Sequence, residues 1–450
     1  MLYPPIHLKR GKAESLRRFH PWVFSGAIHS LPRNMEEGQL VEVFDDEGHY
    51  VATGHWQIGS IAVRVLTFRR QEITRDFWLR RIRQAYLVRQ TLGLIRPDNN
   101  AYRLVHGEGD RLPGLVVDMY ADTAVVQAHS VGMHIVRQTI AEVLCEVTGV
   151  HNIYYKSETT LPFKADLHQQ NGFLIGGAPG IETVGTENGL RFNIDWLRGQ
   201  KTGFFVDQRD NRSLVEHYSR GRRVLNMFCY TGGFSVYALR GDAACVHSVD
   251  SSAKAVELVN ANVALNFPGD PRHEAFCEDA FKFLEHIPEA SRKEDTEKDG
   301  DSAGAKPYDL IILDPPAFAK HKDALRNALK GYTRLNQKAF EKINVNVPWE
   351  MSTQMGAIVD ERQMKKVLDY IEIGKKEGAV VKCGGYRKVD GKLKDGYYIA
   401  PTILEGNNKM RVAREEIFGP VVVIIKFKTE EEAIKWCKIL NSEIPYLSYH

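Results

Sequence analysis

The sequence predicts a multidomain protein in which a β-barrel-like domain, an α+β domain and two α/β segments follow one another. Its 450 residues exceed the usual size of one domain and argue for several. Short strands separated by Gly and Asp fill the first 72 residues. From residue 186 onward, apolar runs alternate with helical stretches, as in a parallel sheet covered by helices.

The composition is that of a globular protein. Hydrophobic residues make up 43% of the chain and charged residues 26%, so several cores can be buried. The formal net charge of +3 means that any nucleic-acid binding must come from local Lys and Arg clusters. No apolar run has membrane-spanning length and the start lacks a signal-peptide core, so we expect a cytoplasmic protein without membrane contact. The six cysteines form no C-x-x-C pair, and we therefore expect no metal site and no disulfide framework.

The first domain, residues 1–72, contains three runs that alternate apolar and polar residues, at 38–48, 50–56 and 60–68. Basic residues crowd its start, with aromatic residues between them. Cations between aromatic faces suit phosphate contact combined with base stacking. The competing interpretation is a solvated basic surface beside core aromatics. The candidate RNA contacts are Lys9, Arg10, Lys12, Arg17, Arg18 and Trp22.

The second domain, residues 73–185, begins with a helix that Thr74 is expected to cap. Trp78, Ile82 and Tyr86 fall on one face of this helix, so that face should be buried. Further along, the stretches 103–120, 123–130, 133–147 and 152–157 read as strand, strand, helix and strand, a compact α+β unit. The arginines predicted to lie on the outer face of the helix, where they could follow an RNA backbone, are Arg75, Arg80, Arg81, Arg83 and Arg89.

The third domain, residues 186–343, has four strand-like runs, at 224–228, 245–250, 274–279 and 308–316. In parallel sheets the ligand lies beyond the carboxyl ends of the strands. The first run leads into Gly232 and Gly233, which permit a tight turn close to a ligand. The second run ends at Asp250, where a carboxylate can accept hydrogen bonds from both hydroxyls of a ribose. The third ends at Glu278-Asp279, which can accept a hydrogen bond from an adenine amino group. This pattern predicts an adenosine pocket.

Two motifs are absent from that pocket. The sequence has no G-x-G-x-x-G and no G-K-[ST], so we expect no loop that cradles a pyrophosphate or a triphosphate, which argues against NAD and ATP as ligands of this sheet. The fourth run ends in Asp314-Pro315-Pro316-Ala317-Phe318. Its prolines fix the backbone where the chain leaves the sheet, which suits clamping a planar base.

With these motifs, residues 1–343 resemble the bacterial 23S rRNA cytosine-C5 methyltransferases that carry an amino-terminal PUA domain. The resemblance implies a Rossmann-like methyltransferase core, S-adenosylmethionine (SAM) as cofactor and ribosomal RNA as partner. It also implies that the first two domains face RNA and that Asp314, Pro315, Pro316 and Phe318 hold the target base. The implied cofactor contacts are Gln200, Lys201, Thr202, Gly203, Phe204, Asp207, Arg209, Phe228, Tyr230, Thr231, Gly232, Gly233, Asp250, Asp279 and Asp314.

Enzymes of this family add a cysteine thiolate to C6 of the cytosine, and the resemblance places that cysteine in a Ser-Cys-Ser motif on the strand after residue 343. Here the chain continues as NVNVPWEMSTQMG (344–356), and no Ser-Cys-Ser occurs in the sequence. The nucleophile is therefore unknown, and the carboxy-terminal strands of the core should be missing. Cys229 lies in the cofactor loop, where a small buried thiol is the ordinary interpretation and a substitute nucleophile the other.

Residues 346–443 resemble an internal fragment of the NAD(P)-dependent aldehyde dehydrogenases, most specifically in AREEIFGPV (413–421). The resemblance implies that Glu416 and Phe418 correspond to residues that hold the nicotinamide ribose and ring. The fragment lacks that family's dinucleotide-binding domain and catalytic cysteine. We therefore expect a chimera joined near residue 344, with residues 344–450 forming a lobe that makes few specific contacts with the core.

Three functions follow from the sequence. The first is a SAM-dependent rRNA methyltransferase acting on cytosine C5, and the second is an RNA- and SAM-binding protein without catalysis. The third, NAD-dependent aldehyde oxidation, is the least supported. A homodimer is left open. A charged, Gly- and Ser-containing stretch at 291–307 is expected to be a surface loop.

Overall fold

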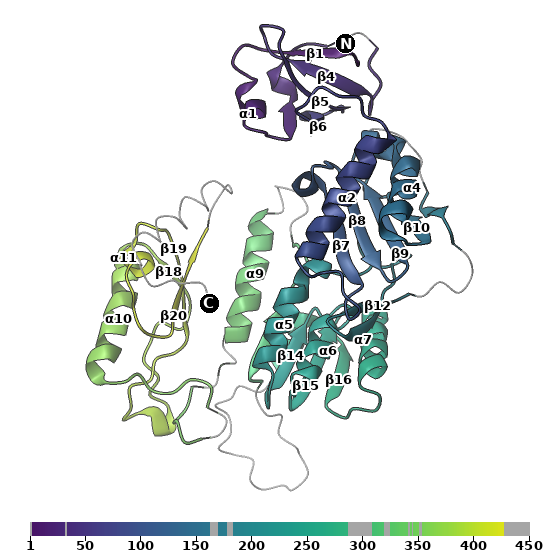
Figure 1. The fold of residues 1–450 in the computed structure, drawn as a ribbon. Coiled ribbons are helices and arrows are strands. Elements are labelled where there is room, and N and C mark those ends of the chain that lie inside the picture. The colour runs from purple at the N-terminus through teal and green to yellow at the C-terminus, as the bar shows by residue number, and fades with distance from the viewer. Residues whose placement is uncertain are drawn as a thin grey trace. The chain divides into compact units, whose positions relative to one another are not determined.

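The computed structural model describes residues 2–31, 34–162, 170–177, 183–286, 308–318, 325–340, 343, 345–350 and 353–426 (Figure 1). It forms two compact units. The first unit comprises Met1–Leu214 and Ala264–Pro268, and the second comprises Val215–Val263 and Gly269–His450. The predicted loop at 291–307 and the predicted join at residue 344 lie outside the described residues. The predicted domain bounds remain predictions.

The first unit begins with a six-stranded sheet of order β2-β6-β5-β4-β1-β3. Its edge strands β2 and β3 are joined by the three-residue turn η1. Six flat strands span about 24 Å, farther than that turn can reach, so the sheet curls back on itself as the predicted barrel-like domain requires. The elements are β1 (Pro5–Leu8), α1 (Glu14–Arg17), β2 (Trp22–Phe24), η1 (Ser25–Ala27), β3 (Ile28–Ser30), β4 (Leu40–Phe44), β5 (Tyr50–Trp56) and β6 (Ile61–Thr67).

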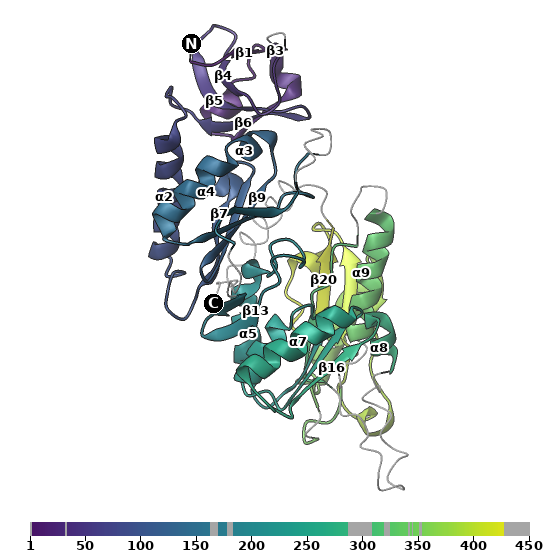
Figure 2. The same cartoon turned by 90° about the vertical axis from the view of Figure 1, so that its right-hand side faces the viewer.

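Next in the first unit is a five-stranded sheet of order β11-β10-β9-β8-β7, on which α2 and α4 pack beside each other (Figures 1 and 2). Helix α2 starts after Thr74, as predicted, although the Thr74 side chain makes no capping hydrogen bond. Trp78 and Ile82 are buried in the shared core. The elements are α2 (Arg75–Thr91), β7 (Ala101–His106), η2 (Gly107–Asp110), β8 (Leu115–Tyr120), β9 (Thr123–Ala128), α3 (Val131–Ile135), α4 (Arg137–Thr148), β10 (Asn152–Tyr155) and β11 (Gly172–Ile175).

Two details of this domain differ from the sequence prediction. The stretch 103–120 is a hairpin of β7 and β8 and not a single strand, because Gly107 and Arg111 take positive φ angles of 50° and 57° and reverse the chain. Arg89 does not lie on an outer face. Its guanidinium is buried and donates to Asp110 Oδ2 at 2.7 Å and to the Arg103 carbonyl at 3.0 Å, so it is unavailable to RNA.

Also in the first unit, β12 (Val184–Glu187) and β13 (Leu190–Asn193) form an antiparallel pair. The 3-10 turn η4 (Val206–Gln208) follows and leads into α5 (Arg209–Tyr218), a helix that crosses into the second unit.

The second unit contains a four-stranded, all-parallel sheet of order β16-β15-β14-β17. All four predicted strand runs form these strands. Leu284 of α8 and Leu335 of α9 share one core cluster with Met227 of β14, so these two helices cover the same face of the sheet. The elements are β14 (Arg223–Met227), α6 (Gly233–Arg240), β15 (Cys245–Asp250), α7 (Ala253–Asn266), β16 (His273–Cys277), α8 (Ala280–His286), β17 (Leu310–Leu313) and α9 (Leu325–Phe340).

The rest of the second unit carries a separate three-stranded sheet, β18-β19-β20. Among the described residues no strand of this sheet pairs with β17. The predicted separate lobe stays a prediction; the sheet is separate, while Gln337 Nε2 of α9 donates to the Lys382 carbonyl of β18 within the same unit. The elements are α10 (Glu361–Lys376), β18 (Val380–Cys383), η6 (Gly391–Leu393), β19 (Thr402–Gly406), α11 (Arg411–Arg414) and β20 (Val421–Ile425).

Candidate functional site

The loop between β14 and α6 has the strained backbone expected of a ligand-binding turn. Phe228, Tyr230 and Gly232 all have positive φ angles, of 56°, 45° and 76°. A Cβ on Gly232 would lie 3.0 Å from Cγ1 of Val259 in α7, so glycine is required both by the backbone angle and by the space. The Asn262 side chain donates to the Thr231 carbonyl at 2.8 Å and holds the turn from α7.

The acidic residues at the neighbouring strand ends are held by backbone N–H groups. Asp250 accepts from Tyr230 N at 3.1 Å and from Ser252 N at 3.0 Å, which ties β15 to the β14 loop. Asp279 precedes α8 and accepts from the N–H groups of Phe281 and Lys282 at 3.0 and 3.1 Å. Because the four strands are parallel, the β14 loop, Asp250, Asp279 and Asp314 lie at the same edge of the sheet. The residues expected to bind adenosine are thus brought together.

The other predicted cofactor contacts, residues 200–209, belong to the first unit. Thr202 is buried, donates to Asp118 Oδ2 at 2.6 Å and lies 3.0 Å from the Tyr120 hydroxyl. Arg209 is mostly buried and lies 3.3 Å from Glu187, while its guanidinium donates to the Ala101 carbonyl at 2.5 Å.

Within the same stretch, Gly203 has a φ of 109° and a Cβ there would approach Trp196 Cα to 2.8 Å, and Phe204 is buried. Contacts within the protein therefore hold four residues of this stretch, namely Thr202, Gly203, Phe204 and Arg209. Three others, Gln200, Lys201 and Asp207, are exposed.

At the predicted base clamp, Phe318 stacks on a residue that the sequence analysis missed. Its ring centroid lies 4.5 Å from that of Tyr332 in α9, at an interplanar angle of 31°. The Tyr332 hydroxyl accepts from Phe318 N at 3.2 Å and donates to the Pro316 carbonyl at 3.4 Å. Tyr332 thus anchors the turn that contains Pro315 and Pro316. Its signal in the sequence was its position one helical turn from the buried Ala328 and Leu335.

Cys229 is a poor nucleophile in this structure. Its thiol is buried, and burial together with the nearby Asp250 carboxylate raises its pKa well above the ordinary value. Cys277, at the end of β16, is exposed and its Sγ lies 3.7 Å from the Ser251 carbonyl. The described residues contain five free cysteines, and no group of three or more His, Cys, Asp or Glu among them could hold a metal ion.

The predicted RNA contacts of the first domain do not form one free basic surface. Arg17 pairs with Asp45 at 2.9 Å, Arg18 with Glu14 at 3.1 Å, and Lys9 donates to the Gly26 carbonyl at 3.0 Å. Trp22 donates through Nε1 to Glu108 at 2.8 Å, a contact to the second domain that explains the conformation of this indole. Arg10 and Lys12 are exposed.

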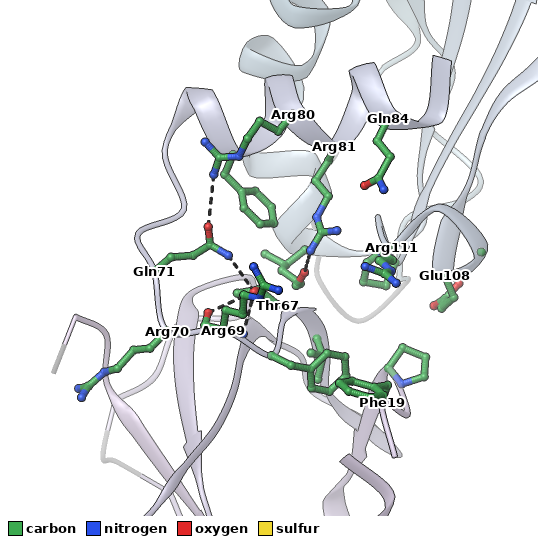
Figure 3. Close-up of a pocket in the computed structure, with 17 residues that line it drawn as sticks. Phe19, Thr67, Arg69, Arg70, Gln71, Arg80, Arg81, Gln84, Glu108 and Arg111 are labelled. Carbon is green, nitrogen blue, oxygen red and sulfur yellow. Dashed lines mark hydrogen bonds between the residues drawn. The ribbon is translucent and has the colours of Figure 1, made fainter. Parts of the chain in front are cut away.

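A larger basic feature lies elsewhere in the first unit. A cavity of about 900 Å³ opens between the six-stranded sheet, α2 and the turn after η2 (Figure 3). We call it the arginine cavity. It is lined by Phe19, Pro21, Val65, Leu66, Thr67, Phe68, Arg69, Arg70, Gln71, Phe77, Arg80, Arg81, Gln84, Glu108, Gly109, Arg111 and Pro113.

Comparisons with known proteins agree with this fold. Family models match a PUA-like domain at residues 6–68 and an S-adenosylmethionine-dependent methyltransferase at 170–346. The chain is 38% identical over 342 residues to a ribosomal RNA large subunit methyltransferase I from Tolumonas auensis, covering 75% of this chain and 82% of the relative. The chain belongs to that family. It therefore carries a SAM-dependent methyltransferase domain, as predicted.

Solved structures show the same fold for this family member. A protein described as a SAM-dependent methyltransferase from Streptococcus mutans matches with a TM-score of 0.61 at 22% identity, covering 76% of this chain and 84% of that one. Another, described as a methyltransferase in complex with SAH, also matches with a TM-score of 0.61 at 22% identity, covering 76% and 83%. The likeness supports the Rossmann-like core. No helix in the described ranges is long and apolar enough to cross a membrane.

A third family model, that of the aldehyde dehydrogenase family, matches residues 327–441, the region in which the sequence resembles that family. It overlaps the methyltransferase match over residues 327–346, which brackets the predicted join. Glu416 and Phe418 lie in the turn between α11 and β20 and are exposed, Phe418 by 74%. The Phe418 carbonyl accepts from Gln363 of α10 at 2.9 Å, so α10 fixes this turn.

Proposed function

We propose that this protein is a SAM-dependent methyltransferase of large-subunit ribosomal RNA, with C5 of a cytosine as the methyl acceptor. Membership of the family carries the proposal. The edge of the parallel sheet supports it, because the β14 loop, Asp250 and Asp279 supply a close backbone approach and two acidic acceptors. When bound, SAM would supply an electrophilic methyl group.

The residues at the sheet edge fit an adenosine group. Each Asp250 oxygen accepts one backbone N–H, and each retains a lone pair for a ribose hydroxyl. The two backbone bonds fix the carboxylate before the ligand arrives, which lowers the entropy lost on binding. Exposed Asp314 and the Phe318–Tyr332 pair follow β17 at the same edge, where a planar base would be held beside the methyl group.

Methylation of C5 requires a thiolate to attack C6, and this requirement supports a second candidate function. Cys229 is buried with a raised pKa, and the Ser-Cys-Ser motif of the family is absent from the sequence. The alternative is therefore a protein that binds SAM and rRNA without transferring a methyl group.

One pair of measurements separates the two candidates. Calorimetry with SAM tests the cofactor site, and transfer of a labelled methyl group to unmodified large-subunit rRNA tests the chemistry. Binding with transfer to a cytosine supports the methyltransferase, and binding without transfer supports the non-catalytic protein. Absence of SAM binding by the folded chain contradicts both. Asp250→Asn should weaken SAM binding, whereas the matched control Asp242→Asn, at an exposed turn after α6, should not.

A further inference from the structure

The turn that follows β17, residues 315–318, depends on α9 for its hydrogen bonds. Its two prolines have no backbone N–H, so half of the turn cannot donate. In the part of the chain that the structure describes, the turn makes no backbone–backbone hydrogen bond. There, both of its hydrogen bonds are to the Tyr332 hydroxyl, which accepts from Phe318 N at 3.2 Å and donates to the Pro316 carbonyl at 3.4 Å.

The same tyrosine sets the plane of the aromatic ring at the end of this turn. The Phe318 and Tyr332 rings are stacked, with centroids 4.5 Å apart and an interplanar angle of 31°. Gly331 leaves room for this pair, because a Cβ there would lie 3.0 Å from Cδ2 of Phe318. Phe318 is half-buried, so part of its ring remains available to a planar base.

Tyr332 is itself carried by a helix that is fixed elsewhere. One turn along α9, Leu335 is fully buried and shares a core cluster with Met227 of β14. Lys338, farther along, pairs with Glu285 of α8 at 2.9 Å. The position of the Tyr332 hydroxyl is therefore set by the core and by α8, and the turn after β17 adjusts to it.

We propose that Tyr332 is a positioning residue for the target base. Its hydroxyl holds the turn in the conformation that presents the Phe318 ring to the base, beside exposed Asp314. The prolines fix the start of the turn, whereas Phe318 depends on Tyr332 for its hydrogen bond and for its ring contact. Tyr332 acts through Phe318 and takes no part in bond making. This inference rests on the proposed function, which supplies the base.

The first test is the rate of methyl transfer to an unmodified transcript of large-subunit rRNA at saturating SAM. Tyr332→Phe keeps the ring and removes only the hydroxyl. It should lower kcat about tenfold or more, because a small displacement of a reacting group is costly, and leave SAM affinity unchanged. The matched control is Tyr370→Phe in the same unit, which removes a hydroxyl that donates to Glu415 at 2.5 Å and should change neither quantity.

A double-mutant cycle separates positioning from a general structural role. If Tyr332 acts through Phe318, then Tyr332→Phe should lower kcat by less than about twofold once Phe318→Leu is present. Gly331→Ala keeps the hydroxyl but crowds the Phe318 ring, and it should lower kcat in the same way as Tyr332→Phe. Near-ultraviolet circular dichroism checks the folding of each variant, and Gly331→Ala decides the question if Tyr332→Phe does not fold.

Hydrogen exchange measured by mass spectrometry gives a readout that needs no catalysis. The Phe318 amide should exchange faster in Tyr332→Phe than in Tyr370→Phe, because it has lost its acceptor. Adding the transcript together with SAH should protect residues 314–318 in the wild-type chain and protect them less in Tyr332→Phe.

The results separate this inference from the proposed function. A kcat for Tyr332→Phe equal to that of Tyr370→Phe, or equal losses with and without Phe318→Leu, would overturn the inference and leave the enzyme standing. If the wild-type chain transfers no methyl group, the enzyme is contradicted and hydrogen exchange decides. Protection that is lost in Tyr332→Phe would then uphold the inference. Equal protection in both chains, or none in either, would overturn it.

Discussion

Gly232 in the proposed cofactor loop combines two constraints that can be separated by mutation. In Gly232→Ala the new residue must adopt a φ of 76°, and its Cβ would meet Val259 Cγ1 at 3.0 Å. Gly221 offers a matched control, because its φ of 69° is similar but no atom lies within 4 Å of its Cβ position. Both glycines belong to the second unit.

The two substitutions should differ by the cost of the contact. Left-handed backbone costs an L-residue about 1–2 kcal/mol, which both variants share. Forcing a methyl group into a filled space adds about 1–3 kcal/mol, which falls on Gly232→Ala alone. The loop can relieve this strain by moving. If the movement costs about 1.4 kcal/mol of binding free energy, the affinity of the loop for SAM falls about tenfold.

The assays are thermal unfolding and calorimetric titration with SAM. Gly221→Ala should lower the unfolding midpoint slightly and leave SAM affinity unchanged, while Gly232→Ala should lower both more strongly. Equal midpoints and equal affinities for the two variants would refute the reasoning, since they would show that the Val259 contact constrains neither the fold nor the site.

Three further predictions concern buried polar groups of the first unit. Asp118→Asn should destabilise the protein by about 3 kcal/mol in denaturant unfolding, because it leaves the mostly buried Arg103, 2.8 Å away, without its carboxylate partner. The control Asp98→Asn, in the exposed pair with Arg96, should cost at most about 1 kcal/mol. Thr202→Val should cost about 1–3 kcal/mol, since it leaves an Asp118 oxygen with one donor fewer. Burial lowers the pKa of His55 from 6.5 to about 4. The unfolded chain therefore binds a proton at a higher pH than the folded chain does, and stability should fall as the pH drops from about 6.5 to about 4. His55→Phe should flatten this dependence.

Each of these has a result that would contradict it. Asp118→Asn and Asp98→Asn of equal stability would mean that the Arg103 pair is not effectively buried. A neutral Thr202→Val would show that the hydroxyl makes no net contribution. An unchanged pH profile in His55→Phe would assign the acid sensitivity to other groups.

The four strands of the parallel sheet in the second unit were predictable from the sequence because each apolar run is short and continuous and helical stretches separate the runs. Such runs can pair only as a parallel sheet, and parallel pairing brings Asp250, Asp279 and the β14 loop to one edge whatever the details of packing. The residues of that edge were therefore predictable without coordinates.

The partners of Thr202, Arg209 and Trp22 were not predictable. All three were predicted to contact a ligand, and the structure gives each a protein partner distant in the sequence, namely Asp118, Glu187 and Glu108. A residue type suited to binding a ligand is equally suited to a structural hydrogen bond. Only the fold decides which neighbour satisfies it.

The sequence by itself determined that this chain carries a SAM-dependent methyltransferase core, followed by a segment similar to the aldehyde dehydrogenase family, because motifs and hydrophobic periodicity are local properties of the chain. Only the tertiary structure decided which arginine side chains lie close together around one cavity. Arg69, Arg80 and Arg111 are separated along the sequence by 11 and 31 residues and line one cavity only because α2 packs against two sheets. Electrostatic potential depends on distance in space, and chain separation does not report it.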